Sequence, residues 1–194
     1  MMQRHKFQFI GEALAFDFVN TEIVVRRKPV DLLNTADDLL EWWNAALDHY
    51  DMRVPVPPGQ DIRAAFMRAK TLRSALRRLF TAVVEKKPPL EADLEILNDV
   101  LSVGHSRLVV TPKNRFGVDH VSEKNDAMLL TIVHSAAWLL TECERERLHK
   151  CKNDPCVLMF LDTTKNGNRV WCSTDCMNRA RSSKHYHQSK QDRE

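Results

Sequence analysis

Apolar side chains recur at helical spacing over most of residues 1–149, and polar side chains fill the positions between them. In residues 60–87 apolar residues return every three or four positions, which predicts the longest helix of the chain. Thr35 precedes two aspartates and an apolar stripe, so it is expected to cap a helix that runs to about Ala46. Further helices are predicted over residues 13–20, 91–101 and 126–149.

Two segments instead favour strands. Residues 7–9 alternate aromatic and polar side chains, which predicts a short strand, and residues 107–111 and 118–122 predict a hairpin against the helices. The fold class expected is therefore mainly α with a small β component (α+β) over residues 1–149. Residues 150–194, where the apolar periodicity ends, are expected to form a smaller second domain.

The polar face of the longest predicted helix is strongly basic. A charge run on an amphipathic helix is usually a solvated face, so we expect these residues to face water rather than nucleic acid. They are Arg63, Arg68, Lys70, Arg73, Arg77 and Arg78.

Three polar residues near the start of the chain are set among aromatic ones: Asp17, Asn20 and Thr21. Buried polar groups need hydrogen-bond partners, so these side chains are expected to tie neighbouring backbone together. The functional alternative is that they form the polar floor of a pocket for a small-molecule effector.

Composition is that of an ordinary globular protein, with 43% hydrophobic and 28% charged residues in a chain of 194. Its apolar runs are too short to span a bilayer, and no uninterrupted apolar segment follows the first residues, so neither a membrane partner nor a signal peptide is expected. These features predict a cytoplasmic location. In a reducing compartment cysteine pairs bind metal more often than they form disulfides, while the single Cys143 is expected to be a core thiol.

Four cysteines dominate the last part of the chain. Cys151 and Cys156 form a C-x4-C pair, fifteen residues follow, and Cys172 and Cys176 form a C-x3-C pair. Each short loop can bring two sulfurs about 3.7 Å apart around Zn–S bonds of roughly 2.3 Å, so the spacing predicts one structural Zn²⁺ held by all four thiolates.

The surroundings of the cysteines predict how the site is built. Ser173 can cap a helix with Asp175 in its first turn, which places Cys172 before the helix and Cys176 one turn along it. The first pair is expected on a knuckle, and the stretch between the pairs is expected to form a hairpin that turns at Gly167. This layout is typical of a treble-clef-like zinc finger.

Motifs in both parts of the chain resemble those of known families. The second cysteine pair resembles the CGNR zinc-finger family, which is named after its Cys-Gly-Asn-Arg motif. The residues that carry this resemblance are Trp171-Cys172-Ser173 followed by Cys176-Met177-Asn178-Arg179. Phe16-Asp17-Phe18-Val19-Asn20-Thr21 is similar to the ABATE domain that precedes such fingers. Proteins of this architecture are described as candidate stress-induced bacterial transcription regulators. The sequence departs from the motif at Met177, which replaces glycine, and in the x3 spacing of its second pair, where x4 would be expected.

The resemblance implies that the four cysteines bind zinc, that Asn178 and Arg179 are the motif's polar pair, and that the partner is DNA. Residues 165–190 contain six Lys or Arg against one acid, which marks where a nucleic-acid contact would lie. The candidates for DNA contact are Lys165, Arg169, Asn178, Arg179, Arg181, Lys184, His185 and Tyr186. Arg179 has a structural alternative, because three residues after a ligand it can instead donate to a sulfur or a carbonyl and brace the site.

The leading functional hypothesis is therefore a zinc-dependent DNA-binding transcription regulator, in which the N-terminal domain senses a signal or forms a homodimer. The alternative is a structural zinc module for protein–protein interaction without a nucleic-acid role. An enzyme is not expected, since four cysteines leave no open metal position and no acid–base constellation accompanies them.

Overall fold

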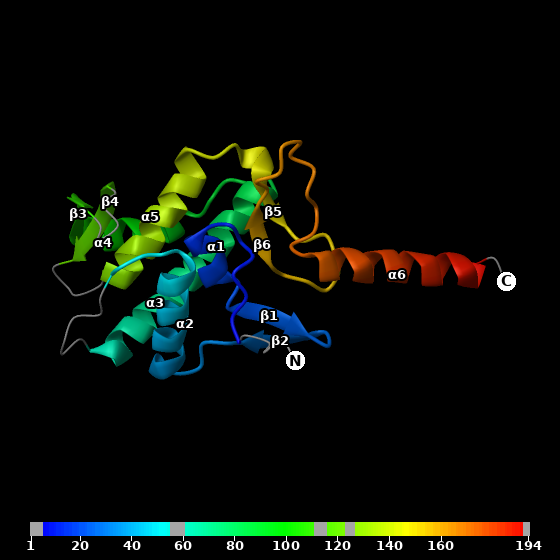
Figure 1. The fold of residues 1–194 in the computed structure, drawn as a ribbon, viewed down its shortest axis with the longest axis horizontal. Coiled ribbons are helices and arrows are strands. Elements are labelled where there is room, and N and C mark those ends of the chain that lie inside the picture. The colour runs from blue at the N-terminus through cyan, green and yellow to red at the C-terminus, as the bar shows by residue number, and fades with distance from the viewer. Residues whose placement is uncertain (1–5, 55–60, 111–115, 123–126, 192–194) are drawn as a thin grey trace.

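The computed structural model describes residues 6–54, 61–110, 116–122 and 127–191 of the chain. Within these ranges the side chains of residues 116, 117, 119 and 184–191 are left out of the description. Helices account for most of the regular structure, and Figure 1 shows five of them gathered into one body from which the last helix projects. The helices are α1 (Leu14–Val19), α2 (Ala36–His49), α3 (Ile62–Val84), α4 (Glu91–Ser102), α5 (Ala127–Thr141) and α6 (Thr174–Gln191).

The strands form three separate two-stranded antiparallel sheets, β1–β2, β3–β4 and β5–β6. Their bounds are β1 (Glu22–Val25), β2 (Lys28–Asp31), β3 (Gly104–Val110), β4 (Phe116–Ser122), β5 (Leu148–Lys150) and β6 (Met159–Leu161). The mainly α fold with a small β component is thus confirmed. Among the described residues no helix is long and apolar enough to cross a membrane.

Helix α1 is the centre of the body, and all six of its residues are buried. It contacts α3, α5 and β6. Phe16 packs on Phe80 of α3 with ring centroids 4.7 Å apart, and Phe18 packs on Trp42 of α2 at 5.0 Å. The short apolar segment therefore forms a helix because it is surrounded, since six residues would be far too few for an isolated helix.

The periodicity placed α2, α3 and α4 correctly, and local chemistry explains where two of them begin. Thr35 caps α2 as predicted: its hydroxyl accepts from the Asp38 amide and the Asp38 carboxylate accepts from the Thr35 amide, which is a complete capping box. Asp61 caps α3 by accepting from the amides of Arg63 and Ala64. The predicted hairpin of β3 and β4 is also present.

Two sequence predictions about elements were wrong, and one element was missed. Residues 7–9 form no strand; Phe7 is buried in the core and Phe9 stacks on His49. Helix α5 ends at Thr141, and the charged residues after it form a 3₁₀ turn (Arg145–Arg147) and then β5 instead of further helix. The hairpin of β1 and β2 was not predicted, because its two-residue turn, Arg26-Arg27, carries no Asn or Gly.

The basic face of α3 is solvated only in part: Arg63, Arg68 and Arg78 are exposed as expected, whereas Lys70, Arg73 and Arg77 are at least half-buried and paired, which corrects the expectation for these three. Arg73 is 1% exposed and forms a two-armed contact with Asp31, with N–O distances of 2.8 and 2.7 Å. Arg77 donates to Glu22 and to the carbonyl of Val19. Two neighbours are also paired, Lys70 with Asp31 and Arg78 with Asp93. Lys70, Arg73 and Arg77 therefore anchor the β1–β2 hairpin to the body through its terminal carboxylates.

The β5–β6 hairpin joins the body to the cysteine-rich segment. Leu148, Met159 and Leu161 belong to the main hydrophobic core, whereas Leu158 and Phe160 belong to a second cluster that contains three of the cysteines. Successive side chains of a strand point to opposite faces, so β6 forms one wall shared by two cores. The domain boundary predicted between residues 149 and 150 falls inside β5, and the two-domain division itself stays a prediction.

Candidate metal centre

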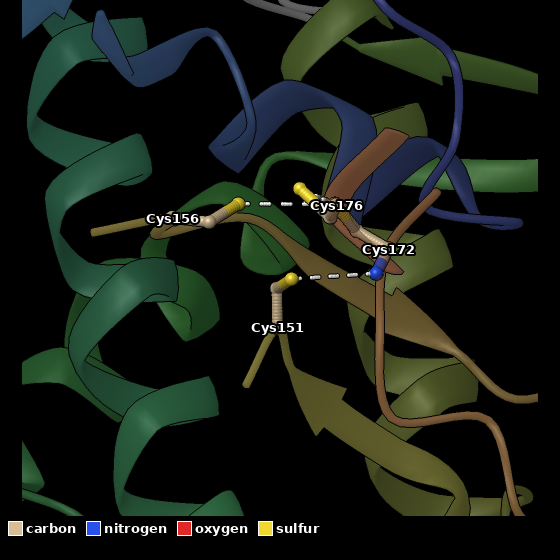
Figure 2. A group of neighbouring side chains, drawn as sticks. All are labelled: Cys151, Cys156, Cys172 and Cys176. Carbon is tan, nitrogen blue, oxygen red and sulfur yellow. Dashed lines mark hydrogen bonds between the residues drawn. The ribbon is translucent and has the colours of Figure 1, made fainter. Parts of the chain in front are cut away.

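The four cysteines that the spacing singled out converge on one point. All four sulfurs lie within 4.8 Å of one another, and Figure 2 shows the side chains facing a common centre. The Cys156 and Cys172 sulfurs are 3.7 Å apart and those of Cys172 and Cys176 are 3.4 Å apart. Tetrahedral zinc with Zn–S bonds near 2.3 Å needs sulfurs roughly 3.7 Å apart, so the set has the dimensions of a zinc site.

The first pair lies on a knuckle between β5 and β6. The Cys151 amide donates to the Leu158 carbonyl at 2.8 Å, which closes the hairpin, and the Cys156 amide donates to the Asn153 carbonyl at 2.7 Å, which closes the turn within it. These backbone bonds direct both sulfurs inward, and the knuckle predicted from the spacing is confirmed.

The second pair lies at the start of α6, as predicted. Ser173 accepts from the Cys176 amide through its hydroxyl at 3.3 Å, and Asp175 lies in the first turn. Cys172 therefore precedes the helix and Cys176 follows one turn later. The N-terminal end of a helix carries a partial positive charge, so the first turn of α6 is a favourable place for negatively charged metal ligands.

The hairpin expected between the two cysteine pairs is not present, because its first strand pairs with a different segment. Strand β6 pairs with β5, which precedes the cysteines, and residues 169–171 are not in a strand. The turn itself is present: the Gly167 amide donates to the Thr164 carbonyl, and Gly167 has a φ of +63°. The knuckle-plus-helix arrangement is thus established, and the treble-clef class stays a prediction.

A buried carboxylate holds this loop closed in place of strand pairing. Asp162 is completely buried and accepts from the amides of Thr164 at 2.8 Å and Arg169 at 2.7 Å. Burial acts to raise the pKa of Asp162, but the hydrogen bonds from Thr164 and Arg169 outweigh it and lower that pKa below its ordinary value.

The electrostatics of the sulfurs fit a divalent cation. Hydrogen bonds with neighbouring thiols lower the pKa of Cys151 but, together with burial, raise the pKa of Cys156 and of Cys172. The crowded thiols therefore cannot all ionise by themselves. A zinc ion supplies the positive charge that four thiolates need, and the four sulfurs fill its tetrahedron, so the centre is a single structural zinc site.

Arg179 lies against this centre. Its Nη2 donates to the Cys176 sulfur at 3.2 Å and its Nε to the Asp175 carbonyl at 3.3 Å. An N–H donor and a positive charge beside a thiolate both stabilise the ionised ligand. Of the two roles considered for Arg179 from sequence, the described geometry favours the brace, although the residue is also exposed.

Arg169 is likewise occupied inside the molecule. Its guanidinium donates to the carbonyls of Trp171 and Cys172, forms an ion pair with Glu12 at 3.2 Å and lies 4.5 Å from the Phe160 ring centroid. These contacts fix the segment before Cys172 against the start of the chain. DNA contact by Arg169 stays a prediction that this geometry disfavours.

The other candidate DNA-binding residues divide into two groups. Lys165, Asn178 and Arg181 are exposed, the first in the loop after β6 and the others on α6. The backbone of Lys184, His185 and Tyr186 continues α6, but their side chains lie outside the described residues.

The polar residues of the N-terminal segment are engaged with protein partners. Asp17 accepts from the amides of Ile10 and Gly11 and from the Tyr50 hydroxyl, and burial raises its pKa to about 6. Thr21 donates to the Phe18 carbonyl and accepts from Arg73. The pocket alternative for these residues stays a prediction.

Asn20 makes the contact that sequence reasoning missed. Its side-chain amide donates to the Met159 carbonyl and its oxygen accepts from the Met159 amide, both at 2.8 Å. One side chain thereby pairs with β6 as a further strand would, and it connects α1 with the hairpin that carries the first cysteine pair. Its partner lies 139 residues away, so no local signal could have identified it.

Comparison with known families gives two adjoining matches. Residues 12–142 match the ABATE family, described as "putative stress-induced transcription regulator", and residues 147–189 match the CGNR zinc finger. Among curated proteins, none matches the chain significantly.

Proposed function

The chain belongs to the ABATE family, and from this premise we propose that it is a DNA-binding transcription regulator whose zinc ion is structural. The zinc finger is the part that would contact DNA. The ABATE-like body would sense a signal, bind a small-molecule effector or form a homodimer. A role on DNA fits the cytoplasmic location expected from the sequence.

Helix α6 is the observation that carries this proposal. It begins at the zinc ligands and projects from the body as a single helix in Figure 1. Its sequence contains four Lys or Arg and a single acid, Asp175, which lies in its first turn. A helix of this kind fits the major groove, where Arg and Lys can bind phosphates and Arg and Asn can bind base edges.

Zinc serves this arrangement by fixing the direction of the helix. Cys172 and Cys176 bind at its first turn, and β6, which follows the knuckle that holds the other two ligands, is hydrogen-bonded to the body through Asn20. With four thiolates in place no coordination position is left for a substrate, so we propose no catalytic reaction at the metal.

The proposal is tested by titrating fluorescently labelled random duplex DNA with purified protein at 50 and 200 mM salt and measuring anisotropy. We expect weak binding that is strongly salt-dependent, because a single finger neutralises only a handful of phosphates. Arg181→Ala/Lys184→Ala should weaken it without changing zinc content, since Arg181 is exposed and Arg179 is left in place.

A matched control removes two exposed arginines elsewhere, Arg53→Ala and Arg63→Ala, which follow α2 and begin α3. The start of α3 lies at the opposite end of the body from α6 in Figure 1. No binding at low salt, or equal weakening by both variants, would overturn the proposal. The protein-interaction module without a nucleic-acid role would then be the better account.

A further inference from the structure

We propose that the tip of the β1–β2 hairpin, residues Arg26, Arg27 and Lys28, is a second contact with the phosphate backbone of the DNA bound by α6. This inference rests on the proposed function and extends it to a surface outside the zinc finger. The partner is duplex DNA, and the contact is with its phosphates rather than its bases.

The tip is a concentrated positive charge. Three successive cations occupy the turn and the start of β2, and all three are exposed. Most basic residues around them are neutralised: Lys70, Arg73 and Arg77 are paired with Asp31 and Glu22 at the root of the same hairpin. The carboxylates at the root therefore do not offset the charge at the tip.

The only carboxylate paired with the tip among the described residues is Asp154, and the pair is loose. Arg27 and Asp154 are 3.8 Å apart, and their side chains are 79% and 85% exposed. Ion pairs between side chains this exposed contribute little, so Arg27 can leave Asp154 for a phosphate at small cost.

The backbone of the turn is a second, independent observation. Val25 pairs with Lys28, which leaves Arg26 and Arg27 as a two-residue turn, and their φ angles are +51° and +64°. This conformation is natural for Asn-Gly and costs free energy in arginine. Stability of the turn alone would thus favour other residues at these two positions, which is consistent with a functional role for the two arginines.

The position of the hairpin connects it with the finger. Asp154 lies in the zinc knuckle between Cys151 and Cys156, so its pair with Arg27 places the tip beside the knuckle. Ile23 of β1 packs against the cluster that holds the cysteines. In Figure 1 the hairpin and α6 extend from the same end of the body, as two arms that one duplex could contact together.

The root of the hairpin is rigid enough to hold that position. Arg77 donates to the Glu22 carboxylate at 2.7 Å and to the Val157 carbonyl at 3.3 Å, so one side chain bridges β1 and the segment after the knuckle. The Leu32 amide donates to the Thr21 carbonyl at 2.8 Å and closes the base. Because these contacts hold the hairpin backbone in place, only the side chains at the tip lose entropy when they bind phosphates.

The test is the variant Arg26→Asn/Arg27→Gly in the full-length zinc-loaded protein. Asn-Gly is the preferred sequence for this turn, so the hairpin should fold at least as well while two charges are lost. Each phosphate contact contributes about 0.9 to the slope of log affinity against log salt, so we expect the slope to become shallower by about 1.8. Between 50 and 200 mM salt, the factor by which affinity falls should therefore be about 12 times smaller for the variant than for the wild type.

Three outcomes are distinguishable. A shallower slope and weaker binding at 50 mM, with Arg53→Ala/Arg63→Ala unchanged, support the contact. A slope equal to that of the wild type, while Arg181→Ala/Lys184→Ala still weakens binding, overturns the hairpin contact and leaves the proposed function standing. No binding of duplex DNA by the wild type overturns both.

Discussion

The side chains that decide the finger's stability are not all ligands. Arg179 is named by the family motif as part of a polar pair, yet its guanidinium contacts the Cys176 sulfur at 3.2 Å. A partner of this kind typically changes metal affinity by 10- to 100-fold when it is removed. A substitution at Arg179 would therefore affect zinc affinity as well as any contact with nucleic acid.

Replacing Arg179 with alanine should weaken zinc binding. We expect zinc affinity to fall by about 10- to 100-fold, because the variant removes both a donor and a positive charge from the thiolate of Cys176. Competition with a chromophoric chelator measures the change. Arg181→Ala is the matched control, since Arg181 is exposed and two residues further along the helix. Equal zinc retention by the two variants would show that Arg179 does not brace the site.

At the scale of elements, α3 shows what periodicity can and cannot predict. Its apolar stripe located the helix to within three residues at each end, because a buried face must repeat with the helical turn. Its basic stripe was misinterpreted at Lys70, Arg73 and Arg77, since the same spacing is compatible with solvated or paired cations. The arginines are paired because Glu22 and Asp31 lie beside them on the β1–β2 hairpin. That hairpin could not be predicted, since its Arg-Arg turn lacks the Asn or Gly typical of such turns.

Arg73→Met tests the buried part of that contact. The variant keeps much of the side-chain volume but leaves Asp31 without its two-armed partner, so we expect a loss of about 3–5 kcal/mol in the free energy of unfolding. Because Asp31 keeps its pair with Lys70 and is 26% exposed, the lower end of this range is expected. Urea denaturation measures the loss. Arg63→Met, the same change at an exposed position of α3, should stay within about 0.5 kcal/mol of the wild type, and a similar effect of both would contradict a buried ion pair.

The same limit applies to the finger. Cysteine spacing predicted the four ligands, the knuckle and the helix start, because those depend on residues a few positions apart. It could not predict that Asn20 pairs with Met159, since that contact joins residues 139 positions apart. It also missed that β6 pairs with β5, although these strands are close in sequence, because the hairpin was expected between the two cysteine pairs. The strand predicted over residues 7–9 is absent, because the aromatic alternation there reflects packing against the core rather than strand pairing.

For the molecule as a whole, the zinc site and the body should be coupled in stability. The β5–β6 hairpin contributes Leu148, Met159 and Leu161 to the main core, and Asn20 binds it from α1. Removing zinc with a chelator under reducing conditions should therefore lower the melting temperature of the body helices, followed by circular dichroism at 222 nm. A loss of a few kcal/mol corresponds to a decrease of about 5–15 °C in a protein of this size.

Adding zinc back should restore the original melting temperature, which excludes irreversible damage as the cause. A body that melts at the same temperature with and without zinc would contradict the coupling. That result would indicate that the hairpin keeps its place on α1 without the metal.

The double-faced strand β6 has a consequence for protein engineering. Met159 and Leu161 face one core and Leu158 and Phe160 face the other, so the finger has no outer surface of its own along this strand. A recombinant fragment that starts at residue 147 would present that apolar side to solvent and tend to aggregate. Chimaeras made to test the proposed DNA contact should therefore exchange α6 and its loop alone, and keep the knuckle together with the body that supports it.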